Sequence, residues 1–114
     1  MHEWSVMAYL LERVETHADR LGATKVIAIN LVVGERSSII DDSLLFYFDM
    51  LTPGTLAEGA QLNVRRTLMR CHCSHCDDDY HPTGVDFRCP RCDAVGRVTD
   101  DGSELLIESL EVAT

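Results

Sequence analysis

The sequence predicts an α+β fold: a small three-stranded sheet with two helices, plus an inserted zinc-ribbon-like domain with four cysteine ligands. Three observations support this expectation. Apolar residues recur at helical spacing in two segments, and three other segments have the composition of strands. The remaining segment, residues 70–102, holds all five cysteines. This order places a cysteine-rich module between the second and the third strand.

The first helix is predicted over residues 4–21, where polar side chains separate apolar ones at the spacing of an amphipathic helix. Gly22 is placed to end it, because glycine readily adopts the left-handed conformation of a helix C-cap. Asp41 or Asp42 can cap a second helix, which the Pro-Gly pair at residues 53–54 stops. The apolar positions of the second helix are Leu44, Leu45, Phe48 and Leu51.

Three strands are predicted over residues 25–33, 61–69 and 105–112. The first is rich in isoleucine and valine and is apolar on both faces, which is typical of a central strand. In the second strand, Leu62 and Val64 are expected on one face, because side chains alternate between the two faces of a strand. The three strands therefore predict one sheet with the first strand in its centre.

The segment 70–102 contains few large apolar side chains, so it cannot bury enough surface to offset the entropy lost on folding. A bound metal supplies the difference, with apparent binding free energies of about 10–16 kcal/mol in structural zinc peptides. We therefore expect two domains. Residues 1–69 and 103–114 form the first, and residues 70–102 form a zinc-binding domain inserted into it.

Two C-x-x-C hooks can converge on one tetrahedral ion: the first hook is Cys73 and Cys76, and the second is Cys89 and Cys92. Zinc accepts four thiolates and closes a structural site of this kind. A dithiol redox pair is one alternative, and two facing motifs argue against it. Iron in the same sulfur cage is the other, because tetrahedral sulfur suits both metals. The fifth thiol, Cys71, is expected to be free or a secondary metal contact.

Three histidines lie around the hooks: His72, His75 and His81. A histidine can replace a cysteine as a zinc ligand, but four thiolates already complete the tetrahedron. We therefore expect these histidines at the solvated surface.

The chain of 114 residues carries a net charge of −9 and has a pI near 4.8. This balance opposes nonspecific binding to nucleic acid and to anionic membranes, where cationic patches supply most of the affinity. No apolar run approaches the roughly 20 residues of a membrane span, and the first residues lack the pattern of a signal peptide. We expect a cytoplasmic protein without nucleic-acid or membrane partners.

The N-terminal residues Met1, His2 and Glu3 form a second unusual feature. The α-amine has a reference pKa of about 7.7–8.0, so part of it is unprotonated near neutrality. The His2 imidazole can close a chelate with this amine across the intervening peptide nitrogen. Nitrogen donors in one plane suit nickel(II) or copper(II), and Glu3 adds a carboxylate oxygen. An ordinary frayed terminus is the alternative interpretation.

Four motifs follow one another along the chain. Met1-His2-Glu3 opens an amphipathic helix, Val33-Gly34-Glu35 follows, a C-x-x-C … C-P-x-C module comes next, and a terminal strand over residues 104–112 completes the series. Each motif is modest alone, but the set resembles the HypA/HybF family of nickel metallochaperones for NiFe-hydrogenase maturation. The resemblance spans essentially the whole chain.

This resemblance implies that residues 1–69 and 103–114 are a nickel-binding domain. Nickel is implied to be a transient cargo at Met1, His2 and Glu3, so no catalytic residue is expected. Structural zinc is implied at the two hooks. In some relatives a histidine of the zinc domain is thought to join the nickel shell, and the sequence matches no particular histidine to that role.

The resemblance also implies partners. These are a HypB-type GTPase, the hydrogenase large subunit and, for some members, urease maturation proteins. The oligomeric state stays open between a monomer and a weak or domain-swapped dimer.

Three rival functions stay open from the residues alone. The first is a zinc-ribbon module that binds protein or nucleic acid without any nickel function. The second is an enzyme with a catalytic metal, which a filled four-thiolate cage disfavours because catalytic zinc keeps an open position. The third is a rubredoxin-like electron carrier with iron in the cage.

Overall fold

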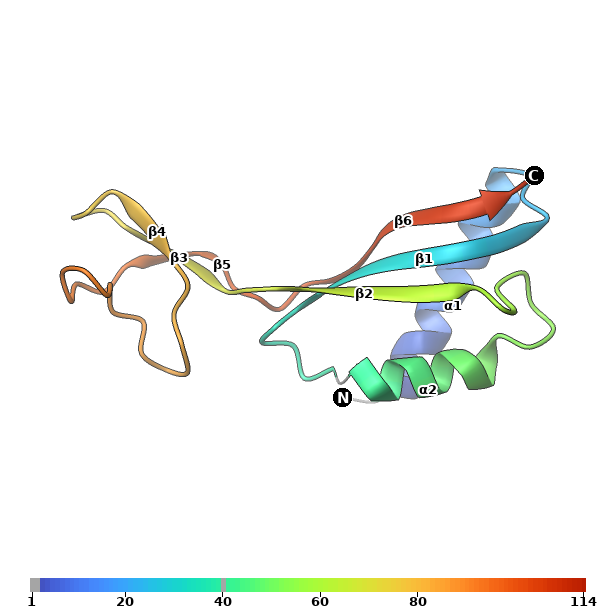
Figure 1. Cartoon of the computed structure of the whole chain (residues 1–114), viewed down its shortest axis with the longest axis horizontal. Coiled ribbons are helices and arrows are strands. Elements are labelled where there is room, and N and C mark those ends of the chain that lie inside the picture. The colour runs from blue at the N-terminus through green and yellow to red at the C-terminus, as the bar shows by residue number, and fades with distance from the viewer. Residues whose placement is uncertain (1–2, 40) are drawn as a thin grey trace. The chain divides into compact units, whose positions relative to one another are not determined.

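The computed structural model describes residues 3–39 and 41–114. Two compact units divide the chain: the first lies within residues 3–32, 38–65 and 106–114, and the second consists of residues 33–37 and 66–105. The described residues form an α+β fold, which confirms the predicted fold class. In chain order the elements are α1 (Glu3–Arg20), β1 (Lys25–Gly34), α2 (Asp41–Leu51), β2 (Gln61–Thr67), β3 (Arg70–Cys73), β4 (Asp78–Tyr80), β5 (Arg97–Asp100) and β6 (Leu105–Ala113) (Figure 1).

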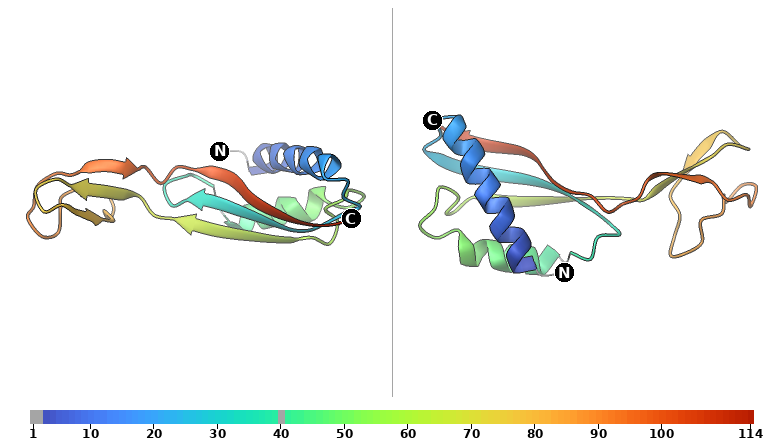
Figure 2. Two further views of the ribbon diagram at one scale, coloured as in Figure 1. Left: turned by 90° about the horizontal axis from the view of Figure 1, so that it is seen from above. Right: turned by 180° about the vertical axis from the view of Figure 1, so that it is seen from behind.

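The first unit is built on a three-stranded sheet with the order β2-β1-β6, so the strand predicted to be central is central. Helix α1 crosses one face of this sheet, as Figure 1 and Figure 2 show from opposite sides, and it contacts α2. Neither helix in the described ranges combines the length and the apolarity that a membrane crossing requires.

The core of the first unit follows the periodicity of its elements. The buried residues of α1 recur every three or four positions, as expected for an amphipathic helix: Met7, Leu10, Leu11, Val14 and Ala18. Strand β1 contributes Val26, Ile29 and Leu31, each at most 2% exposed, and α2 contributes Leu44 and Phe48. Because both the helices and the central strand bury apolar side chains here, this unit has a conventional hydrophobic core.

Helix α1 is capped by the glycine that the sequence indicates as its end, two residues after Arg20. Gly22 has φ = 66°, its N–H donates to the carbonyl of Asp19, and the N–H of Ala23 donates to the carbonyl of Ala18. These two bonds form a Schellman motif, which satisfies carbonyl groups that the last turn of a helix otherwise leaves unpaired.

The second unit has its own three-stranded sheet, with the order β4-β3-β5. Strand β3 is antiparallel to both neighbours, and its register with β4 pairs Cys71 with Tyr80 and Cys73 with Asp78. These strands are only three or four residues long. Such short strands cannot hold a sheet together by themselves, so the loops and side chains around them carry the unit.

The segment 33–37 belongs to the second unit through backbone hydrogen bonds. The N–H groups of Gly34 and Arg36 donate to the carbonyls of Glu104 and Gly102 at 2.7 Å each. A carboxylate oxygen of Glu35 accepts a 2.8 Å bond from the N–H of Met69. The Val33-Gly34-Glu35 motif thus lies in a backbone connection of this unit.

Gly34 is required by a close backbone approach. A Cβ at this position would lie 2.1 Å from the carbonyl oxygen of Gly102 and 2.7 Å from the nitrogen of Ser103. Both atoms belong to the backbone, which cannot move aside as a flexible side chain could. Only glycine fits here without displacing the chain.

Replacing Gly34 by alanine is therefore expected to lower the free energy of unfolding by about 3 kcal/mol, the upper end of the range for overpacking. Urea unfolding followed by circular dichroism measures the change. Ser38→Ala is the control, because Ser38 is exposed a few residues along the chain and the substitution adds no atom. Its free energy of unfolding is expected to stay within about 0.5 kcal/mol of the parent value. Equal unfolding midpoints for the two variants would contradict the close approach.

Candidate metal centre

The two hooks meet in the second unit. The first spans the end of β3 and the turn into β4, and the second lies in the turn between Cys89 and Cys92. The four sulfur atoms all lie within 4.8 Å of one another. Among the described residues, these cysteines are the only group of three or more side chains so arranged that they could hold a metal ion. Four thiol groups at this spacing are a donor set that fits tetrahedral zinc.

In each hook a backbone N–H lies against the sulfur of the first cysteine. In the first, the N–H of Cys76 lies 3.5 Å from the sulfur of Cys73, and in the second the N–H of Arg91 lies 3.5 Å from the sulfur of Cys89. Each hook is followed by an aspartate in the left-handed region, Asp77 with φ = 55° and Asp93 with φ = 65°. Aspartate tolerates this conformation better than most residues other than glycine. The turns therefore direct both sulfurs of each hook to one side.

Sulfur burial differs within each hook. Cys73 and Cys89 are 1% exposed, whereas Cys76 and Cys92 are half-buried. Together with Cys71 and Tyr80, the buried cysteines form the apolar cluster of this unit. The cluster that fills its interior is therefore largely the same set of atoms that could hold the ion.

Tyr80 links the chain on both sides of the second hook. Its hydroxyl donates to the carbonyl of Phe87 at 2.5 Å and accepts from the N–H of Gly96 at 3.0 Å. Burial raises the pKa of this phenol, so it stays protonated and able to donate. A Cβ on Gly96 would lie 2.5 Å from the Tyr80 oxygen, which explains the glycine at that position.

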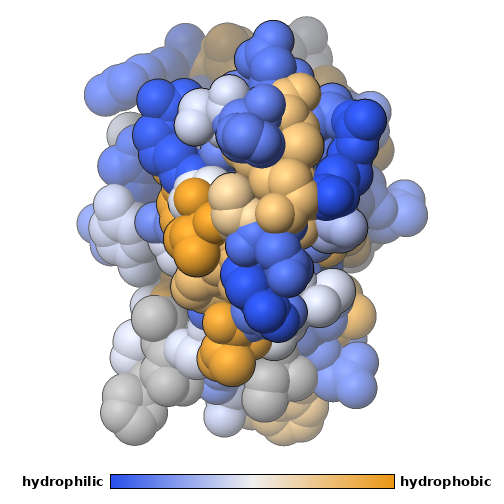
Figure 3. Space-filling view, turned by 90° about the vertical axis from the view of Figure 1, so that its left-hand side faces the viewer, coloured by the Kyte–Doolittle hydropathy of each residue, from blue (hydrophilic) through white to orange (hydrophobic). Residues whose placement is uncertain are grey.

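The valines of this segment do not enter the cluster. Val85, Val95 and Val98 are 92%, 75% and 43% exposed. Figure 3, in which the second unit faces the viewer, shows its apolar surface interrupted and bordered by hydrophilic side chains. The unit thus lacks a conventional apolar core, as its composition predicted.

A backbone contact at one thiol and a sulfur contact at the other separate the thiol pKa values of the first hook. The N–H of Cys76 donates to the sulfur of Cys73 and lowers the pKa of that thiol to about 7 in the metal-free protein. Contact with the sulfur of Cys92 raises the pKa of Cys76 to about 12. Cys73 is thus the thiol of this hook that is poised to be a thiolate at neutral pH.

Arginines beside the hooks pair with carboxylates. Arg91, inside the second hook, forms an ion pair with Asp78, which directly follows the first hook region. Arg88 lies 2.9 Å from Asp86 and 4.0 Å from Asp93. Since these side chains are more than half exposed, solvent screens each pair, and each contributes little to stability. The Arg91 pair nevertheless joins the two hooks.

The histidines and the fifth cysteine lie outside the sulfur group. His72 is half-buried and contacts two carboxylates, with 2.7 Å from Nδ1 to Asp79 and 3.3 Å from Nε2 to Asp77. His81 contacts the carbonyl of Met69 through Nδ1 at 2.9 Å, and His75 is exposed. The sequence places all three histidines at the solvated surface; His75 and His81 are exposed, and His72 is half-buried because the adjacent acidic run provides two partners for its ring. Cys71 is fully buried and pairs with Tyr80 across the sheet.

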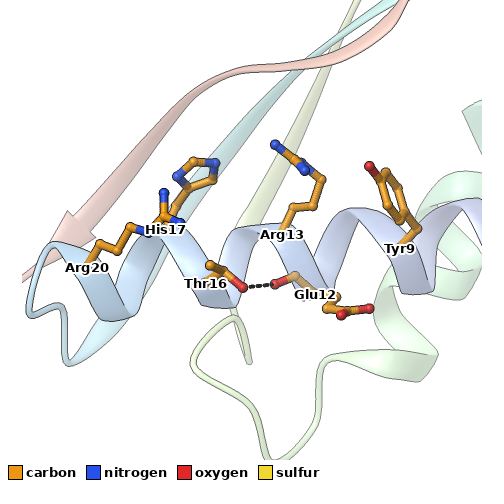
Figure 4. Close-up of a pocket in the computed structure, with 6 residues that line it drawn as sticks. All are labelled: Tyr9, Glu12, Arg13, Thr16, His17 and Arg20. Carbon is orange, nitrogen blue, oxygen red and sulfur yellow. Dashed lines mark hydrogen bonds between the residues drawn. The ribbon is translucent and has the colours of Figure 1, made fainter.

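The predicted nickel ligands are described only in part. Met1 and His2 lie outside the described residues, and Glu3 is the first residue of α1. Further along α1, a hollow of about 210 Å³ is lined by six side chains of this helix (Figure 4). In Figure 4 the Tyr9 ring and the Arg13 side chain point to the same side of the helix, and the guanidinium carbon lies 5.8 Å from the ring centroid. No motif in the sequence indicates this hollow.

Comparison with known proteins assigns the chain to a family. The family model described as "Hydrogenase/urease nickel incorporation, metallochaperone, hypA" matches residues 1–112. The chain belongs to the HypA family. Its members are nickel metallochaperones for hydrogenase maturation, so the resemblance seen in the sequence is confirmed.

Individual relatives agree with this assignment. The chain is 36% identical to hydrogenase maturation factor HypA of Caldanaerobacter subterraneus over 98% of this chain and 99% of that protein. It is 32% identical to HypA of a Picosynechococcus species, again over 98% and 99% of the two chains. The solution structure of the Ni metallochaperone HypA from Helicobacter pylori superposes with a TM-score of 0.68 at 26% identity, covering 100% of this chain and 99% of that one. HypA proteins and this chain therefore share one fold over their whole length.

The position of Cys71 outside the sulfur group gives a matched pair of variants. Cys89→Ala is expected to lose the capacity to hold zinc, because three thiolates leave the tetrahedron incomplete. Cys71→Ala is expected to retain zinc at the level of the parent protein, although the same atoms are removed from the same buried cluster. Elemental analysis of the purified variants measures both. Zinc loss from Cys71→Ala would contradict the assignment of the two hooks as the four ligands.

Proposed function

We propose that this chain binds Ni(II) at its N-terminus and delivers it, with a GTPase partner, to the hydrogenase large subunit. The observation that carries the proposal is the match to the HypA family along residues 1–112 in a chain that begins Met-His-Glu. In this view nickel is the cargo of the protein. The chain needs to hold and release it, and no bond of a substrate is made or broken.

The proposed nickel ligands are the α-amine of Met1, the imidazole of His2 and the carboxylate of Glu3. Amine, amide and imidazole nitrogens in one plane suit the geometry that nickel(II) adopts with nitrogen donors. Copper(II) binds such donors more tightly by the divalent affinity series, so selectivity for nickel has to come from geometry and from the partner that supplies or accepts the ion. A site at a chain terminus also allows incoming ligands to approach, which a donor protein requires.

We propose zinc as the ion of the cysteine cage, with Cys73, Cys76, Cys89 and Cys92 as its ligands. Four sulfurs within 4.8 Å of one another support this assignment, and no fifth position is left for a reacting water. When bound, zinc supplies folding free energy to a unit whose apolar cluster consists mainly of cysteines. The same cage favours a structural role over a catalytic one.

The two metals are proposed to bind different domains of the chain. Residues 1–69 and 103–114 are proposed to carry nickel, and residues 70–102 to carry zinc. Further proposals concern the partners: a HypB-type GTPase, the hydrogenase large subunit and, by the family description, a role in nickel supply to urease. The chain has no glycine-rich phosphate-binding loop, so nucleotide hydrolysis is assigned to the partner. We propose the cytoplasm as the site of action.

His2→Ala is expected to abolish specific nickel binding and to leave the circular dichroism spectrum and the zinc content unchanged. Isothermal titration with Ni(II), on protein with a native and untagged N-terminus, measures the affinity. The affinity of the parent protein should fall as pH drops from about 8 to 6, because protons compete for the amine and the imidazole.

A chemical control tests the same proposal without a mutation. Acetylation of the α-amine removes one nitrogen donor and keeps every side chain, so it should weaken nickel binding as His2→Ala does. Unchanged affinity after acetylation, or in His2→Ala, would refute the N-terminal site while leaving the zinc assignment untouched.

A further inference from the structure

Helix α2 exposes large apolar side chains on its outer side. It lies at the margin of the first unit (Figure 1), and its buried residues are Leu44 and Phe48. Leu45, Phe46 and Met50 are 41%, 59% and 51% exposed. Isolated exposed apolar residues are ordinary, but three large ones on an 11-residue helix form a concentration that usually marks a binding surface.

Two carboxylates lie among these apolar side chains. At 3.6 residues per turn, Leu45, Asp49, Asp42, Phe46 and Met50 follow one another around the helix within an arc of about 140°. All five are exposed. We call these five residues the α2 face. Its composition is apolar and acidic, without a basic residue.

Among the described residues, no cation pairs with either of these two carboxylates. In the described ranges, neither Asp42 nor Asp49 takes part in an ion pair or hydrogen bond. Asp49 is also in the last turn of α2, which contains no basic residue. A negative charge is unfavourable there, because the helix macrodipole places its own negative end at the C-terminus. A cation supplied from outside would offset this unfavourable placement.

The largest apolar side chain of the α2 face is held by a neighbour. The rings of Phe46 and Tyr47 meet edge to face, with centroids 5.1 Å apart and an interplanar angle of 78°. This arrangement is favourable for aromatic pairs and limits the rotamers that Phe46 samples. An anchor that is already ordered loses less conformational entropy when a partner covers it.

We propose that the α2 face docks a basic amphipathic segment of a partner protein. Apolar side chains of that segment would cover Leu45, Phe46 and Met50, and its lysines or arginines would lie against Asp42 and Asp49. The two apolar faces would pack against each other, and the charges would set the register and orientation of the segment. The inference concerns the helix alone and does not depend on where nickel binds.

The charges select this occupant over two others. A second copy of the chain docking by the same face would bring four carboxylates into one interface without a cation, because a two-fold interface is made of the same surface on both copies. An anionic membrane would meet the same two carboxylates and a chain with a net charge of −9. A cationic, amphipathic protein segment is the occupant for which both the apolar and the acidic groups find partners.

The proposal is tested with a fluorescent 14-residue peptide of leucine and lysine at helical periodicity. Full-length, zinc-loaded protein without nickel is titrated into the peptide, and the fluorescence anisotropy of the peptide reports binding. A peptide of the same composition in scrambled order controls for charge alone. Phe46→Ser and Met50→Ser should each weaken binding of the periodic peptide about tenfold, as truncation of an interface anchor does. Asp49→Asn should weaken it about threefold at low salt and have little effect at high salt.

Matched controls come from the second unit. Val85→Ser removes a side chain that is 92% exposed, and Asp101→Asn removes an exposed carboxylate from the same acidic chain. Both should bind the periodic peptide as the parent protein does. The proposal is overturned if Phe46→Ser binds like Val85→Ser, or if the parent protein binds both peptides equally. It is also overturned if sedimentation shows that the α2 face joins two copies, with a parent dimer that Phe46→Ser converts to a monomer.

Discussion

The convergence of four cysteine sulfurs is the constraint on which the second unit depends. Its strands are three or four residues long, its valines face solvent, and the cluster that fills its interior consists of Cys71, Cys73, Cys89 and Tyr80, with Cys76 and Cys92 packed against it. The residues that would hold an ion are therefore also the residues that would otherwise have to form a core. With an ion in the cage, a unit of this kind would gain most of its folding free energy from that ion, and its stability would depend on metal concentration as well as on packing.

The first unit follows the opposite principle. Its helices and its central strand bury aliphatic and aromatic side chains at the spacing that their secondary structure dictates, and Gly22 closes α1 with two backbone hydrogen bonds. Apolar burial of this kind needs no ligand. One chain thus contains two units with different sources of stability, and removing metal is expected to affect them unequally. The free energy of unfolding should therefore depend more steeply on denaturant concentration for the first unit than for the second, because the first unit exposes more apolar surface when it unfolds.

Periodicity and spacing in the sequence are sufficient to predict the elements whose structure depends on nearby residues. The amphipathic pattern predicts α1, the double-sided apolar run predicts the central position of β1, and the two C-x-x-C hooks predict the sulfur cluster. Features that depend on contacts between distant segments could not be predicted. Strands β3 to β5 are too short to leave a pattern, and Gly34 is explained only by the backbone near Gly102. The half-buried His72, with carboxylates at both ring nitrogens, depends on the fold of the acidic run after the first hook. Residues Met1 and His2 lie outside the described ranges, so the nickel ligands stay a prediction.

The left-handed aspartates after the two hooks affect the unfolded chain as well as the folded one. Glycine would adopt the conformations of Asp77 and Asp93 without strain, yet it would also give the free polypeptide many more backbone states to abandon. Aspartate accepts some strain in each turn and narrows that search. Before any ion arrives, both halves of the cage thus start from a smaller conformational ensemble, and wrapping them around the ion loses correspondingly less disorder.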